Sequence, residues 1–94
     1  MAAIPPLSDI EIQRELASLP GWGRRGNALV RSCAFPTFPA AIDWVRRVAD
    51  VAEAMNHHPD IDIRYTKVTL TLSTHDSGGI TARDITLARR IDAL

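Results

Sequence analysis

The sequence has little of several features that define common protein classes. Among its 94 residues there is a single cysteine, Cys33, which excludes an internal disulfide framework and a multi-cysteine zinc site and is typical of a reducing compartment. Lysine plus arginine equals aspartate plus glutamate at 11 each, so no net charge attracts nucleic acid or an anionic membrane. No apolar run approaches the ~18–20 residues that a membrane-spanning helix needs. These absences predict a protein without nucleic-acid or membrane partners.

The N-terminal segment lacks the features of a secretory signal. Residues 1–7 have neither a basic start nor a long apolar core, and Pro5 and Pro6 favour a loose chain. We therefore expect a cytoplasmic protein with a flexible tail over 1–7 and a single domain over 8–94. Domains of ~100–150 residues are the commonest, and a chain below that size buries a modest fraction of its surface. Association into an oligomer would help to stabilise it.

Periodic apolar patterns predict three helices. Ser8 and Glu11 have the spacing of a capping box, which predicts a helix over 9–18. A second helix of about seventeen residues opens near Phe38, because apolar residues then recur at spacings of three and four. Thr81 and Asp84 mark the start of a third helix that runs to the C-terminus.

Alternating patterns predict four strands. Segments 22–25 and 28–35 form a hairpin around Gly26 and Asn27. Segments 61–65 and 67–73 alternate with a period of two, which indicates an antiparallel sheet with one wet face. In the second strand, Arg31 shares a face with apolar residues, so the pattern leaves open which face is buried. The order α-β-β-α-β-β-α predicts an α+β fold, a four-stranded antiparallel sheet with helices packed on one face.

The apolar stripe of the long helix is wider than packing on one sheet requires. Trp44, Val51 and Met55 extend it sideways until it covers roughly half the circumference. The extra width predicts a contact with another helix or with a second subunit. A partly exposed Trp44 is the alternative.

All three histidines lie between positions 57 and 75. Asn56 can adopt the left-handed conformation that ends helices, so it marks the end of the long helix. His57 and His58 follow that helix, His75 follows the last strand and Asp84 opens the last helix. Because imidazole titrates near neutral pH, with an ordinary pKa of about 6.5, and because the ends of elements carry most sites, these residues could line one cleft. A polar helix cap is the alternative for the pair. The spacing is not of the HExxH kind, so we expect no metal.

The combined pattern resembles the pterin-4a-carbinolamine dehydratases, over residues 8 to 92. Their signature is Glu-x3-His-His-Pro, then an aromatic residue, then His, then Asp. Further matches are a Gly-Trp pair after the first helix, a Ser-Thr-His stretch and an Ile-Thr pair after glycine. In this sequence the signature and these matches correspond to Glu53, His57, His58, Pro59, Tyr65, His75, Asp84, Gly21, Trp22, Ser73, Thr74, Gly79, Ile80 and Thr81.

The resemblance implies a hydro-lyase that needs no metal or organic cofactor. Its small-molecule substrate would be a 4a-hydroxytetrahydropterin left behind by an aromatic amino acid hydroxylase. Its product would be quinonoid dihydropterin, which a reductase returns to tetrahydrobiopterin. Loss of water needs a protonated hydroxyl and a proton removed from nitrogen. Histidines suit both steps, and each such step contributes roughly 10²–10⁴-fold.

The same resemblance implies roles for individual residues. His57 and His75 would be the acid and the base, and His58 would form the pocket wall with a share in proton transfer. Asp84 would orient a histidine, with His75 as the first choice. Tyr65 would support the core or the pocket. Contacts to the substrate are expected from Glu53, Trp22, Ser73 and Thr74.

Alternatives stay open for three of these residues and for the function. Asp84 could be a cap at the third position of the last helix, and it could serve both roles. Glu53 could be a solvated charge, although it precedes His57 by one helical turn and could bond that imidazole if the turn persists. Trp22 could equally pack in the core. For the function, the alternative is a non-catalytic binding or dimerisation cofactor, because family members in animals also assist a homeodomain transcription factor. A homo-oligomer, dimer or tetramer, is expected in either case.

Overall fold

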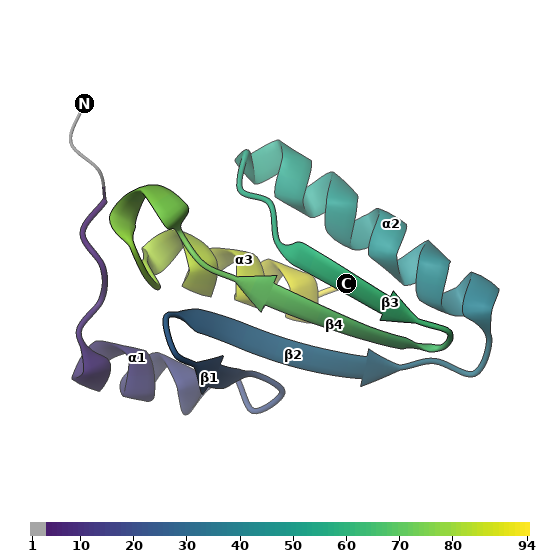
Figure 1. Ribbon diagram of the computed structural model, residues 1–94, viewed down its shortest axis with the longest axis horizontal. Coiled ribbons are helices and arrows are strands. Elements are labelled where there is room, and N and C mark those ends of the chain that lie inside the picture. The colour runs from purple at the N-terminus through teal and green to yellow at the C-terminus, as the bar shows by residue number, and fades with distance from the viewer. Residues whose placement is uncertain (1–3) are drawn as a thin grey trace.

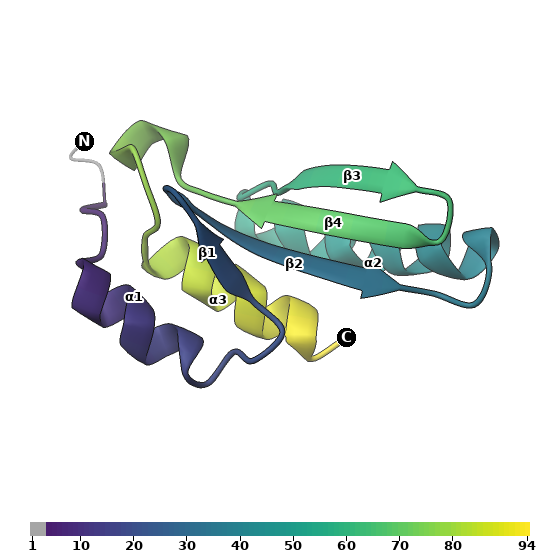
Figure 2. The same cartoon turned by 60° about the horizontal axis from the view of Figure 1, so that its bottom comes forward.

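A four-stranded antiparallel sheet carries three helices on one face (Figures 1 and 2). The computed structural model describes residues 4–94. The predicted class and element order are confirmed, with one added 3₁₀ turn, η1. The elements are α1 (Asp9–Leu16), β1 (Gly23–Arg25), β2 (Ala28–Ala34), α2 (Phe38–Met55), β3 (Asp60–Arg64), β4 (Lys67–Leu72), η1 (His75–Ser77) and α3 (Ala82–Asp92).

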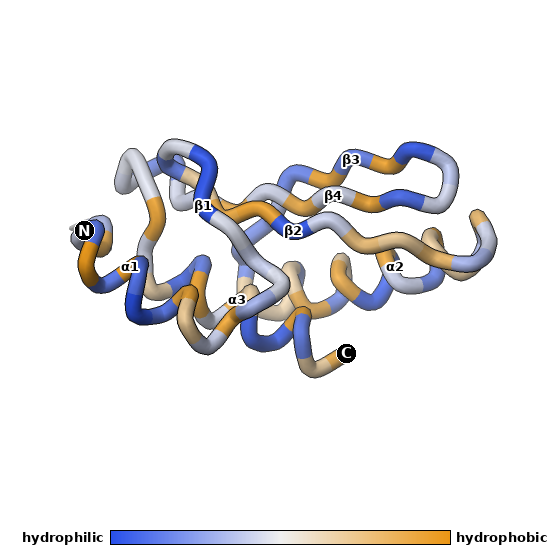
Figure 3. Tube along the Cα trace, turned by 90° about the horizontal axis from the view of Figure 1, so that it is seen from below, coloured by the Kyte–Doolittle hydropathy of each residue, from blue (hydrophilic) through white to orange (hydrophobic). Residues whose placement is uncertain are grey.

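The sheet has the order β1-β2-β4-β3, so β2 and β4 are its central strands. Val68, Leu70 and Leu72 of β4 are buried under the helices, and the residues between them are more exposed. Figure 3 shows the same alternation of apolar and polar residues along β3 and β4. One face of the sheet is therefore packed on the helices, as the period of two predicted.

The buried face of β2 is the one that carries an arginine. Leu29 has no exposed surface and pairs with Leu72 of β4. Arg31 lies on the same face, where its guanidinium forms an ion pair with Asp92 at the end of α3. The charge that obscured the sequence pattern is thus compensated by a carboxylate from a distant helix.

Local signals explain where the helices begin and end. Ser8 and Glu11 form the predicted capping box at α1, although the regular helix ends at Leu16, two residues before the predicted end. Thr37 caps α2, which ends at Asn56 in the left-handed conformation with φ 50°. Asparagine tolerates this conformation better than most residues.

The flank of α2 that was predicted to contact another helix or a second subunit packs partly against the core of the same chain. Trp44 and Val51 are half-buried and pack against the core. The Trp44 ring lies 5.3 Å from the Phe35 ring, centroid to centroid, in a tilted arrangement. The large apolar residues that α2 exposes are instead Phe38 and Ile42.

The segment before α1 runs beside the loop that leads into α3. Leu7 donates a backbone hydrogen bond to Ile80 at 2.8 Å, and the Ser77 hydroxyl donates to the carbonyl of Ile4. Residues 1–3 of the predicted tail lie outside the described residues. Within residues 4–94, no helix combines the length and the apolar character needed to cross a membrane.

Candidate active site

Four chain segments meet at one end of the sheet (Figure 1). They are the C-terminus of α2, the segment that follows β4, the turn η1 and the first turn of α3. Between them lies a cavity of about 260 Å³ that all three imidazoles line. The lining residues are Asn56, His57, His58, Ser73, Thr74, His75, Asp76 and Arg83.

The end of α2 turns the first histidine inward. Asn56 adopts the left-handed conformation, and the backbone N–H of His57 then donates to the carbonyl of Ala52 at 3.0 Å. This closes the helix and leaves His57 buried, with 8% of its surface exposed. His58 remains exposed beside it.

Asp84 holds the ring of His57 from inside the protein. The distance from His57 Nε2 to Asp84 Oδ1 is 2.5 Å, and Asp84 has no exposed surface. The other oxygen, Oδ2, accepts the Thr81 backbone N–H and the Thr74 hydroxyl, both at 2.9 Å. A carboxylate only accepts hydrogen bonds, so His57 donates from Nε2 and its Nδ1 is left free.

The hydroxyls beside this carboxylate form a directed chain. Thr74 donates to Asp84, so the 2.7 Å contact between the two threonine hydroxyls is donated by Thr81. Thr81 Oγ1 in turn accepts the backbone N–H of Arg83 at 3.2 Å. Every polar group around the buried carboxylate therefore has a partner, which keeps the carboxylate in one orientation.

The expectation that Asp84 orients His75 is wrong. Thr74, the residue before His75, takes the place on the carboxylate, and His75 lies on the exposed turn η1. The bond goes to His57, which the left-handed turn at Asn56 directs inward. The expected helix-capping role is confirmed, because Asp84 Oδ2 caps Thr81 as the N3 member of a capping box.

Glu53 binds the second histidine of the pair. Its Oε1 lies 2.7 Å from His58 Nε2, and both side chains are largely exposed. The alternative contact with His57 does not form, because α2 ends before the turn that would align the two side chains. Glu53 is also not among the residues that line the cavity.

The other expected contact residues divide between the cavity and the core. Ser73 and Thr74 line the cavity, although the Thr74 hydroxyl is engaged by Asp84. Trp22 is instead in the core, 5% exposed, and its indole N–H donates to Asp92 at 2.9 Å. The packing alternative therefore describes Trp22.

Tyr65 also lies away from both places predicted for it. It is 75% exposed, with φ 53°, in the turn between β3 and β4. Neither the core nor the cavity includes it. The sequence predicted Tyr65 as the last residue of a strand over 61–65, but β3 ends at Arg64 and Tyr65 belongs to the turn.

Sequence reasoning missed Asn56, Asp76 and Arg83 as cavity residues. Asn56 was recognised as a helix end but not as part of the site. The sequence did contain a signal for Arg83. A basic residue in the first turn of a helix is repelled by the helix dipole, which indicates that its side chain has another role. Within residues 4–94, no group of three or more histidine, cysteine, aspartate or glutamate side chains is arranged to hold a metal ion.

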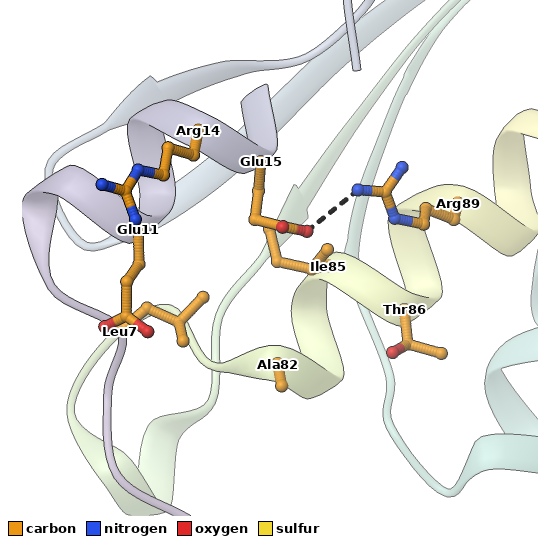
Figure 4. A pocket seen from close by; sticks show the side chains of 8 residues that line it. All are labelled: Leu7, Glu11, Arg14, Glu15, Ala82, Ile85, Thr86 and Arg89. Atoms are coloured by element: carbon orange, nitrogen blue, oxygen red, sulfur yellow. Dashed lines mark hydrogen bonds and ion pairs between the residues drawn. The ribbon is translucent and has the colours of Figure 1, made fainter. Parts of the chain in front are cut away.

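A larger cavity of about 430 Å³ lies between α1 and α3 (Figure 4). Three of its charged side chains are engaged within the chain: Arg89 binds Glu15 at 2.9 Å, and Glu11 belongs to the capping box of α1. No histidine lines it. The smaller cavity therefore holds the groups that can exchange protons near neutral pH.

A known protein family matches nearly the whole chain. Residues 5–94 match the family described as Pterin 4 alpha carbinolamine dehydratase. The chain belongs to this family. The predicted family is thereby confirmed, and with it an enzyme class, the hydro-lyases that the family name denotes.

Relatives of the same name cover the whole length of the chain. A protein of Roseiflexus castenholzii, provisionally named a pterin-4-alpha-carbinolamine dehydratase, is 53% identical over 100% of this chain and 99% of its own. A relative from Nocardia farcinica with the same provisional name is 56% identical over 94% of this chain and 93% of its own.

Solved structures show the same fold. A transcriptional coactivator/pterin dehydratase from Brucella melitensis has a TM-score of 0.89 and 34% identity, over 94% of this chain and 96% of its own. A pterin dehydratase-like protein identified as a RuBisCO assembly factor in the alpha-carboxysome has a TM-score of 0.62 and 23% identity, over 77% of this chain and 83% of its own. The second likeness concerns the fold alone.

Proposed function

We propose that the protein removes water from a 4a-hydroxytetrahydropterin, giving quinonoid dihydropterin for the recycling of tetrahydrobiopterin. The observation that carries this proposal is the convergence of three imidazoles from separate segments on one cavity, with one ring bound to a buried carboxylate. Membership of the dehydratase family supports the reaction type. The volume of the cavity is about 260 Å³, just below the lower end of the usual range for ligand pockets, ~300 Å³. A cavity of this volume suits a substrate as small as a bicyclic pterin.

The chemistry requires one proton donor and one proton acceptor. As the C4a–O bond breaks, the hydroxyl takes a proton from one imidazole and leaves as water. A ring nitrogen gives its proton to the other imidazole, and its electron pair forms the new C=N bond. We assign these two roles to His57 and His75. Asp84 keeps His57 in the tautomer whose free Nδ1 can take part in proton exchange.

The remaining cavity residues would hold the substrate or complete the site. Ser73 offers a hydroxyl for a pterin polar group. His58, exposed and bound to Glu53, would form the wall at the mouth and share in proton transfer. Thr74 would act indirectly, because its hydroxyl is already donated to Asp84.

A direct assay tests the proposal. We expect the wild-type protein to accelerate water loss from chemically generated 4a-hydroxytetrahydropterin. His57→Ala should lose at least about tenfold in kcat/KM, because one acid–base partner is removed. Its far-UV circular dichroism should stay native. Arg89→Gln, on α3 but outside the histidine cavity, should keep the wild-type rate.

The alternative function is an outcome of the same assay. If wild type and His57→Ala both behave like buffer, the dehydratase proposal fails. The non-catalytic binding role then gains support. The word coactivator in the name of the Brucella melitensis protein is consistent with such a role.

We also propose that the protein works in the cytoplasm as a homo-oligomer without a nucleic-acid partner. The single cysteine and the balance of 11 basic and 11 acidic residues support the compartment and the absence of nucleic acid. Exposed Phe38 and Ile42 on α2 support an interface between subunits.

A further inference from the structure

Arg83 reaches from the start of α3 to the end of α2. Its Nη2 donates to the carbonyl of Asn56 at 2.8 Å and to the carbonyl of Met55 at 3.2 Å. The same side chain lines the histidine cavity. One guanidinium therefore joins the end of α2, which leads into His57 and His58, to the start of α3, which carries Asp84.

The position of this arginine is unfavourable for its own helix. It stands in the first turn of α3, where the positive end of the helix dipole repels a cation. The last turn of α2, by contrast, has no basic residue of its own. Its final carbonyls lack helical partners and form the negative end of that helix. Arg83 supplies from α3 the cation that α2 lacks, so its contacts serve the end of α2.

The two contacts bear directly on the histidine pair. Asn56 contributes its carbonyl to the peptide bond that leads into His57, and it is the residue in the left-handed conformation. Arg83 binds the carbonyl of that peptide. Asp84, the next residue, binds the His57 ring. Consecutive residues of α3 thus fix both the backbone and the ring of one histidine.

We propose that Arg83 is a positioning residue that orients the backbone of His57 and His58 for proton transfer. Its catalytic consequence depends on the proposed dehydratase function, whereas its effect on the geometry of the histidines does not. Misplacement of a catalytic group by about 1 Å can cost as much as 10²-fold in rate. Loss of the hydrogen bonds from Arg83 to the end of α2 should therefore lower kcat.

Three variants test this role. Arg83→Gln removes the cation and the fork of donors, and Arg83→Lys keeps the cation but offers a different geometry. Arg89→Gln is the matched control, because Arg89 also extends from α3, to Glu15 and Ser18 of the α1 region, away from the histidine cavity. Thermal unfolding curves of the variants identify a temperature at which all are folded, and kcat and KM are measured at that temperature.

We expect Arg83→Gln to lower kcat about tenfold with KM changed less than about twofold. Arg83→Lys should recover to within about threefold of wild type, and Arg89→Gln should be unchanged. A kcat within twofold of wild type in Arg83→Gln would overturn the proposal. So would a raised KM with unchanged kcat, because that pattern indicates direct substrate binding. If Arg83→Gln does not fold, the proposal is tested with Arg83→Lys. We then expect kcat to fall about twofold to threefold in Arg83→Lys and to stay unchanged in Arg89→Gln.

A second measurement needs no turnover. Nitrogen-15 NMR of the histidine rings, assigned with His→Ala variants, should show His57 and His58 signals displaced in Arg83→Gln or Arg83→Lys and His75 unmoved. Arg89→Gln should leave all three unchanged. If the pair does not move, the positioning role is wrong even in an active enzyme. If the pair moves but wild type has no dehydratase activity, only the proposed function fails.

Discussion

At the scale of single residues, Asp84 performs two tasks that the sequence presented as separate options. One oxygen caps α3 through Thr81 and accepts from Thr74, and the other binds His57. A fully buried carboxylate is costly unless all its acceptor positions are used. The cap and the site therefore depend on each other.

This double use predicts a double effect for Asp84→Asn. The amide nitrogen must face at least one of the three donors, so we expect the free energy of unfolding, measured with urea, to fall by about 1–3 kcal/mol. We also expect kcat to fall more than about tenfold, because an amide group next to Nε2 favours the wrong tautomer of His57. A folded variant with wild-type activity would contradict the assigned role. Asp43→Asn, at an exposed position of α2, is the control.

At the scale of elements, capping chemistry determines where the helices stand. The capping boxes of α1 and α3 are both complete. The hydrogen bond from the backbone N–H of Ser8, with a further contribution from the Ser8 side chain, holds the pKa of the exposed Glu11 carboxyl below its ordinary value of 4.5.

The lowered pKa of Glu11 has a defined consequence for pH dependence. A carboxyl whose pKa is lower in the folded protein contributes stability above its ordinary value of 4.5, and this contribution is lost as the pH falls through the lowered pKa. Urea midpoints measured from pH 7 downward should therefore fall more steeply below about pH 4.5 for wild type than for Glu11→Gln. Parallel curves for the two proteins would show that the capping box does not form in solution.

At the scale of the whole molecule, large apolar side chains remain exposed on β3 and on α2. The edge strand β3 exposes Ile61 and Ile63, each by more than a third, and α2 exposes Phe38 and Ile42. An edge strand also presents unpaired backbone groups. The predicted oligomer would cover such surfaces, which a small domain cannot bury by itself.

Light scattering at micromolar concentration tests the assembly. We expect the wild-type protein to have the mass of a dimer or a tetramer. Ile42→Glu should shift it towards the monomer, because a charge would enter the apolar contact of α2. Ile10→Glu, at an exposed isoleucine of α1, should leave the mass unchanged. A wild-type protein that is strictly monomeric would contradict the prediction.

The sequence by itself determined the elements and their order. Ser8 with Glu11 and Thr81 with Asp84 start helices, Asn56 ends one, and Gly26 turns the first hairpin. Such signals act within a few residues of the chain, so they can be recognised without knowledge of the fold. The positions of the three histidines at the ends of elements suggested a common cleft, and family resemblance added the reaction and the roles of the residues.

Only the tertiary structure decided which groups in the site are partners. His57 and Asp84 are 27 residues apart, and Arg83 is 27 residues from the Asn56 carbonyl that it holds. Trp22 and Asp92 are 70 residues apart. The first two contacts depend on how the end of α2 and the start of α3 meet on the same face of the sheet. The physical reason is that hydrogen bonds need separations of about 3 Å and correct angles, which no local pattern specifies between distant segments.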